Sequence, residues 1–243
     1  LNSDGDRVAI GAPYNDGTAS NAGHVRVYQR DEGNTTVEPL GWTQLGSDID
    51  GEDDTFSYSG GSVSLNSDGD RVAIGAHYND GTGDAAGHVR IYEYSNSSWS
   101  QLGSDIDGEA AYDESGYSVS LDSDGDRVAI GASHNNGGGT GAGHVRIYEY
   151  SSGSWTQLGS DIDGETAGDN SGYSVSINSD GDRVAIGANM NDGAGTSAGH
   201  VRLYEYSSGS WTQLGSDIDG EAAYNYSGGS VSLNSDGDRV AIG

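Results

Sequence analysis

Large and small side chains alternate along residues 117–121 (Tyr-Ser-Val-Ser-Leu), which is the pattern of a β-strand. An Asp-Gly turn at 122–126 leads to a second predicted strand over 127–132. An Asn- and Gly-rich loop precedes a third strand over 144–150, and a Ser-Gly turn precedes a fourth over 155–159. No segment shows helical periodicity. The sequence therefore predicts an all-β fold of short antiparallel strands.

This strand pattern recurs along the chain at a fixed spacing. The nine residues Ser-Asp-Gly-Asp-Arg-Val-Ala-Ile-Gly begin at Ser3, Ser67, Ser123, Ser179 and Ser235. Each step is 56 residues except the first, which is 64 because of an insertion at 30–41. Units of this kind must stack to bury their apolar faces. We expect one array over 1–243, with a partial unit at 1–56, units at 57–112, 113–168 and 169–224, and the start of another at 225–243.

The two faces of each predicted sheet differ in side-chain size. The large face carries Val119, Leu121, Val128 and Ile130, and the small face carries Ser118, Ser120, Ala129 and Gly131. Small rather than charged residues indicate that the second face is covered by the next sheet. Such stacking predicts a β-propeller of four-stranded antiparallel blades. In the third strand Arg146, Tyr148 and Tyr150 share a face, which we expect to be more exposed. Because residues 1–11 and 233–243 are identical, we expect a segment of a longer array that does not close on itself.

The charge of the chain restricts its partners. The sequence has 38 acidic residues against ten basic ones, all arginine, for a net charge of −28, and it has no cysteine. Such a surface repels phosphate backbones and anionic membranes, so we expect no nucleic-acid partner. No apolar run is long enough for a membrane helix, so we expect no membrane insertion in this segment. Other protein subunits, the rest of the same chain and glycans are the expected partners.

Residues around the second strand resemble the FG-GAP repeats of integrin-type β-propellers. The Gly-Ala-Pro at 11–13 matches the family in full, later copies keep Gly-Ala, and the Phe-Gly position reads Ser-Gly, as at 115–116. The Tyr-Ser-Val at 117–119 is also similar. The resemblance implies a propeller used outside the cell for adhesion or assembly. The Asp-Gly turn at 66–70 is shorter than the family's calcium loop, so the family's calcium ligands do not carry over.

Acidic residues recur in a Ser-Asp-Ile-Asp-Gly-Glu segment after the fourth strand. Closely spaced carboxylates in a turn can supply several of the oxygen ligands that calcium requires. A solvated acidic turn, or pairing with arginine, is the other interpretation. The calcium candidates are Asp105, Asp107, Glu109, Asp161, Asp163, Glu165, Asp217, Asp219 and Glu221.

Histidine and tryptophan also recur at equivalent positions. His24, His88, His144 and His200 precede Val-Arg, while Trp42, Trp99, Trp155 and Trp211 begin the fourth strand. We expect the histidines to be structural, because equivalent positions in successive blades lie far apart and zinc needs converging ligands. The tryptophans suit either a ladder that stacks on sugars or, as we favour, anchors packed at the blade rim. His77 and His134 lie in a variable loop and are expected to be exposed.

Two functional interpretations follow. No nucleophile stands beside a base in a unique segment, so we expect no enzyme. The first interpretation is a non-enzymatic extracellular or cell-surface protein for adhesion or assembly, possibly filamentous. The second is a carbohydrate-binding module that uses the variable loops 13–23, 77–87, 133–143 and 189–199. Asn34, Asn96 and Asn225 match the glycosylation pattern, which would apply only on a secretory route.

Overall fold

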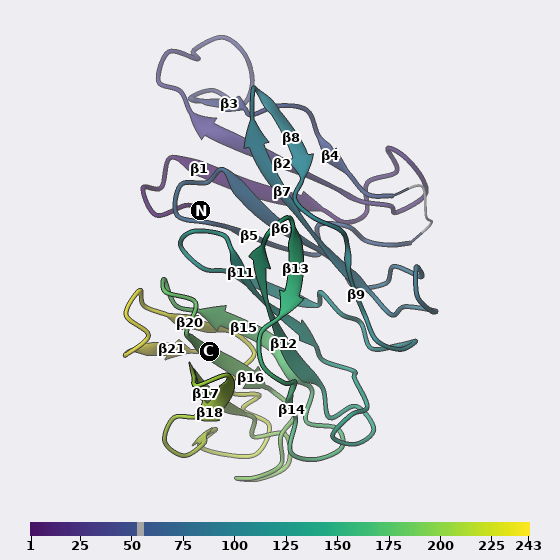
Figure 1. Cartoon of the computed structure of the whole chain (residues 1–243), viewed down its shortest axis with the longest axis vertical. Coiled ribbons are helices and arrows are strands. Elements are labelled where there is room, and N and C mark those ends of the chain that lie inside the picture. The colour runs from purple at the N-terminus through teal and green to yellow at the C-terminus, as the bar shows by residue number, and fades with distance from the viewer. Residues whose placement is uncertain (53–55) are drawn as a thin grey trace.

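The computed structural model describes residues 1–52 and 56–243, and their regular elements are all β-strands (Figure 1). The first sheet contains β1 (Arg7–Ala12), β2 (His24–Arg30), β3 (Trp42–Gln44) and β4 (Ile49–Asp50). The second contains β5 (Ser62–Leu65), β6 (Arg71–Ala76), β7 (His88–Ser95), β8 (Ser98–Gln101) and β9 (Ile106–Asp107).

The same order is repeated in the rest of the chain. The third sheet contains β10 (Ser118–Leu121), β11 (Arg127–Ala132), β12 (His144–Ser151), β13 (Ser154–Gln157) and β14 (Ile162–Asp163). The fourth contains β15 (Ser171–Ile177), β16 (Arg183–Ala188), β17 (His200–Ser207), β18 (Ser210–Gln213) and β19 (Ile218–Asp219). A hairpin of β20 (Val231–Leu233) and β21 (Val240–Ile242) follows. Figure 1 shows the sheets succeeding one another from the purple N-terminal sheet to the yellow hairpin.

Each complete sheet is an antiparallel meander with one short additional strand. In the third sheet the order is β10-β11-β12-β13, as the sequence predicts, while β14 pairs with the start of β12. This fifth strand was not predicted, because two residues are too short to show alternation. It lies within the acidic segment and holds that segment against the third strand. The all-β, repeated antiparallel architecture is thereby confirmed.

The sheets stack with the large face of one on the small face of the one before it. Val119 pairs with Ile130 and Leu121 with Val128, so these side chains share one face as predicted. They form a single core cluster with residues of the preceding sheet, including Ala73. At Gly131 the two sheets come so close that an added Cβ would overlap the carbonyl oxygen of Gly172 in the next sheet. Only glycine permits this approach.

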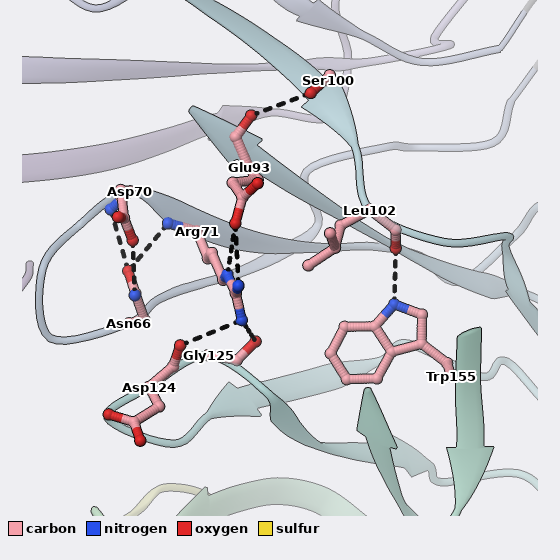
Figure 2. Close-up of polar contacts among 9 residues, drawn as sticks. All are labelled: Asn66, Asp70, Arg71, Glu93, Ser100, Leu102, Asp124, Gly125 and Trp155. Carbon is pink, nitrogen blue, oxygen red and sulfur yellow. Dashed lines mark hydrogen bonds and ion pairs between the residues drawn. The ribbon is translucent and has the colours of Figure 1, made fainter. Parts of the chain in front are cut away.

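Polar side chains also join neighbouring sheets (Figure 2). Arg71 pairs with Glu93 of its own sheet at 2.9 Å, and its NH1 donates to the carbonyls of Asp124 and Gly125 in the next sheet. The indole Nε1 of Trp155 donates to the carbonyl of Leu102 at 2.7 Å. The tryptophans at 99, 155 and 211 are therefore anchors between sheets.

The third strand differs from expectation. Arg146 is only 5% exposed, whereas the sequence predicted an outer position. Its NH2 donates at 2.8 Å to the carbonyl of Asp107 in the preceding sheet, and its guanidinium lies 5.5 Å from the ring centroid of Tyr148. The charge is tolerated because these partners replace water.

One Asp-Gly turn contains an unusual buried carboxyl group. Asp122 occupies the position of Asn66 and is 5% exposed. Asn66 donates from Nδ2 to Asp70 at 2.8 Å, a bond that ionised Asp122 cannot make with Asp126. Burial, followed by the neighbouring Asp126 charge, raises the pKa of Asp122 to about 7.

We therefore predict that Asp122→Asn stabilises the protein at pH 8 by about 2 kcal/mol. The pKa of Asp122 is higher in the folded chain than in the unfolded chain, so ionisation of Asp122 destabilises the fold. This destabilisation is absent at low pH, grows as the pH rises from about 4 to about 7, and is complete above about pH 7. Urea unfolding at pH 4 and pH 8 measures the difference. Asp124→Asn removes a charge from an exposed position of the same turn and is the control. An equal effect at both pH values would contradict the assignment.

A second prediction concerns the tryptophan anchors. Trp155→Phe leaves the Leu102 carbonyl without its donor and is expected to cost about 1 kcal/mol or more. Trp42 makes no indole hydrogen bond with the described residues, so Trp42→Phe is the matched control with a smaller loss. Denaturant midpoints of the two variants are compared with that of the unaltered chain. Equal shifts would show that the indole bond contributes nothing.

Candidate functional site

Buried histidines meet two carboxylates where successive sheets join. At the junction of the second and third sheets, Nδ1 of His144 lies 4.0 Å from Oε2 of Glu109 and 3.9 Å from Oδ2 of Asp161. His144 is 1% exposed. The three ligand atoms lie within 4.8 Å of one another. We call each such set of one glutamate, one histidine and one aspartate a junction cluster.

The short fifth strand brings these residues together. Because His144 pairs with Asp163 and Val145 with Ile162, Asp161 lies beside the start of β12. Glu109 follows β9 of the preceding sheet and reaches across the junction. A similar set of residues recurs between the first and second sheets and between the third and fourth sheets. The other junction clusters are Glu52, His88 and Asp105, and Glu165, His200 and Asp217.

In the cluster of His144, one oxygen of each carboxylate has a protein partner while the other faces the histidine. In the cluster of His88, Oε2 of Glu52 faces the histidine and also accepts a hydrogen bond from Asn79 at 3.2 Å. Gln157 donates to Oδ1 of Asp161 at 2.6 Å, and Oδ2 faces His144. Arg146 NH1 lies 3.5 Å from Oε1 of Glu109, and Oε2 faces His144. Burial, followed by the charge of Arg146, lowers the pKa of His144, so its imidazole is neutral at pH 7.

The first sheet arranges the equivalent residues differently. Arg26 donates to both oxygens of Asp48, at 3.0 and 2.8 Å, and His24 Nδ1 lies 3.7 Å from Oδ2. The Arg26 guanidinium holds the pKa of Asp48 at about 2. Asp48 is therefore fully engaged by an arginine, unlike Asp161.

The structure divides the calcium candidates between neighbouring clusters. Asp105 faces His88, whereas Glu109, from the same segment, faces His144 in the next sheet. Asp161 and Glu165 are separated in the same way, and Asp217 faces His200. Asp107, Asp163 and Asp219 lie in the short fifth strands, and Glu221 joins no such cluster among the described residues. The contiguous acidic segment is therefore not one ligand set, because β-pairing turns its ends toward different sheets.

The Asp-Gly turn at 66–70 is held together by hydrogen bonds of its own side chains. The Asn66 side chain lies inside the turn, where its Oδ1 accepts from the backbone amides of Asp70 and Arg71. Its Nδ2 donates to the Asp70 carboxylate. The turn is thus closed by its own hydrogen bonds, which agrees with the expectation that the family's calcium ligands do not carry over to it. Whether the chain binds calcium stays a prediction.

The variable loops form a second candidate site. Aromatic rings from neighbouring sheets make a continuous series of contacts, which we call the aromatic loop surface. Its residues are Tyr14, Tyr58, His77, Tyr78, Tyr117, His134 and Tyr173. Two of these rings are exposed, Tyr14 at 75% and Tyr78 at 39%. A hollow of about 480 Å³ lies at the same surface and is lined by Phe56, Tyr58, Tyr78, Asp80 and Asp84.

Two histidines of this surface differ in their environment. His77 is half-buried among Tyr58, Tyr78 and Tyr117, so the expectation of a simply exposed residue is wrong, and burial lowers its pKa. His134 is exposed as expected, and its Nδ1 lies 3.1 Å from Glu114. The sequence did not predict this surface, because its rings come from two separate segments of each repeat, the loop after the second strand and the segment before the first strand. Tyrosines just before the first strand, such as Tyr58 and Tyr117, were the sequence feature that could have indicated it.

The glycosylation candidates lie in three different settings. Asn34 Nδ2 donates to the carbonyls of Val37, Pro39 and Trp42 and so helps to order the insertion. Asn96 lies in the turn between β7 and β8 and is exposed. Asn225 is also exposed, and its Oδ1 accepts from the amide of Ala222. Glycosylation itself stays a prediction.

Comparison with known proteins places this architecture among repeat β-structures. No family model and no curated protein matches the chain, so the resemblance to FG-GAP repeats stays a prediction. Among solved structures it is similar to a Bacteroides uniformis protein described as a "putative 6-phosphogluconolactonase", with a TM-score of 0.51 and 10% sequence identity. The match covers 98% of this chain and 75% of that one. At this identity the likeness shows the fold alone.

The expectation that this chain is not an enzyme is wrong on this finding, since its fold is shared with a protein described as a lactonase. The expectation relied on the sameness of the repeats. Repetition does not exclude a unique site, because loops from different sheets meet on one surface. His134 and Glu114 are an example of a pair found in one repeat only.

No helix among the described residues has the length and apolar character to cross a membrane.

The pair of His134 and Glu114 leads to a prediction. The hydrogen bond that the His134 ring donates to the Glu114 carboxylate raises the pKa of His134 above its usual value of about 6.5. Glu114→Gln is expected to lower this pKa, because the neutral amide no longer favours the imidazolium. NMR titration of the ring protons measures it, and Glu149→Gln, which alters an ion pair with Arg127 instead, is the control. An unchanged His134 pKa in Glu114→Gln would refute the assignment.

Proposed function

We propose that this chain is a recognition module of an extracellular or cell-surface adhesion or assembly system. The repeated sheets are its scaffold, and the aromatic loop surface contacts the partner. The observation that carries the proposal is the continuous series of rings across neighbouring sheets, with Tyr14 and Tyr78 exposed. Exposed clustered aromatics are typical of binding surfaces.

The division between strands and loops supports this proposal. The strand Arg-Val-Ala-Ile-Gly-Ala is identical in β1, β6, β11 and β16, whereas the loops that follow differ in every repeat. A scaffold needs constant packing, while a recognition surface needs distinct side chains. We propose further that the sheets are blades of a larger β-propeller. Ile130 is 1% exposed because a neighbouring sheet covers it, whereas the equivalent Ile10 in the first sheet is 52% exposed. A further blade packed against the first sheet would cover Ile10.

A neutral carbohydrate is the second candidate partner. The hollow beside Tyr78 combines aromatic rings with the carboxylates of Asp80 and Asp84. Rings stack on the apolar faces of sugars, and carboxylates accept hydrogen bonds from hydroxyl groups. The net charge of −28 disfavours sulfated or phosphorylated glycans.

The proposal predicts that the double variant Tyr14→Ala and Tyr78→Ala weakens partner binding about tenfold or more, because each exposed ring contributes on the order of 1 kcal/mol. Tyr224→Ala is the control, because it removes an exposed tyrosine that makes no ring contact with another described aromatic residue. A neutral-glycan array tests carbohydrate binding, and sedimentation velocity tests assembly with further copies. Binding in either assay that survives the double variant would reject the surface. Absence of both activities in the unaltered chain would reject the proposed function.

A further inference from the structure

We propose that each junction cluster binds one divalent transition-metal ion of the zinc class. Its protein ligands are the histidine Nδ1, the glutamate Oε2 and the aspartate Oδ2. The ion thereby joins the glutamate of one sheet to the histidine and aspartate of the next. This site is separate from the aromatic loop surface and does not depend on the function proposed for it.

The histidines themselves are the first observation. His88, His144 and His200 are 1–2% exposed, and neither ring nitrogen of any of them makes a hydrogen bond with the described residues. Nε2 of His200 is buried without a partner. Nδ1 of each faces two carboxylate oxygens at 3.8–4.0 Å, which is too long for hydrogen bonds. Buried polar groups are normally paired, whereas Nδ1 of each of these buried rings faces two carboxylates without a hydrogen bond to either.

The spacing is somewhat wider than that of ligands on one ion. Tetrahedral zinc with bonds of about 2.0–2.2 Å places its ligands about 3.3–3.6 Å apart. The nitrogen-to-oxygen separations are 3.8–4.0 Å and the three ligand atoms lie within 4.8 Å of one another, so the carboxylates must move toward the histidine when the ion binds. Glu109 and Asp161 keep 46% and 33% of their side-chain surface exposed, which leaves an open side for entry and for water ligands.

The partners of the carboxylates orient the ligands. Gln157 holds Oδ1 of Asp161, and Arg146 lies beside Oε1 of Glu109, so the free oxygen of each turns toward His144. Such supporting contacts are typical of metal sites. Equivalent contacts come from Gln101 and Arg90 at one junction, and from Gln213 and Arg202 at the other.

Ligand chemistry and charge select the class of ion. Imidazole nitrogen suits zinc and its neighbours, whereas calcium prefers oxygen alone. Two carboxylates outweigh one guanidinium, so each cluster has a net charge of −1 before an ion binds. The proposal excludes the first sheet, because Arg26 already donates to both oxygens of Asp48.

Equilibrium dialysis of the full chain against Zn²⁺, followed by metal analysis, tests the stoichiometry. We expect three ions per chain, one at each junction cluster. Asp161→Asn is expected to weaken zinc binding at its junction about tenfold or more. At a free zinc concentration that only just fills all three sites of the unaltered chain, this variant should bind two ions. Glu149→Gln removes the same charge outside the clusters and should retain three. No zinc binding, or three ions in Asp161→Asn, would overturn the proposal.

Long-range ¹H–¹⁵N NMR supplies a second readout that does not need an altered chain. Zinc addition should shift the Nδ1 resonances of His88, His144 and His200, while those of His77 and His134 stay unchanged. Calcium at the same concentration should leave all five unchanged. Zinc uptake without the three Nδ1 shifts, or equal shifts with calcium, would show that the histidines are not ligands.

Discussion

The stacking of a large-residue face on a small-residue face is the constraint on which the rest of this structure depends. Gly131 lies so close to Gly172 of the next sheet that no Cβ fits between them. Val128 and Ile130 are almost completely buried because the preceding sheet covers them. A sheet of this kind cannot bury its core alone, so the stability of each depends on its neighbours.

Close stacking also determines where the charged groups lie. Arg146 is buried because its strand faces the preceding sheet, and the carbonyl of Asp107 and Glu109 of that sheet become its partners. The buried His144 is brought to the same junction by the pairing of β12 with β14. The junction clusters are thus a consequence of joining two sheets, and no single repeat contains one.

The loops are free of this packing constraint. They lie at the ends of the strands, where Tyr14 and Tyr78 remain exposed. Contacts between rings of neighbouring loops, such as Tyr117 with Tyr173 at 5.0 Å, turn separate repeats into one surface. A repetitive scaffold and a unique surface therefore coexist in the same chain.

The sequence by itself determined the strands, their order and the stacked faces, because alternation and Asp-Gly turns are local and recur at a fixed spacing. Val119 and Val128 share a face as their parity requires. Only the tertiary structure revealed β14, the burial of Arg146 and the separation of Asp105 from Glu109. β14 was missed because a strand of two residues shows no alternation. The other two features depend on which sheet lies across a junction, and motif spacing within one repeat does not contain that information, because the contacting residues lie in neighbouring repeats.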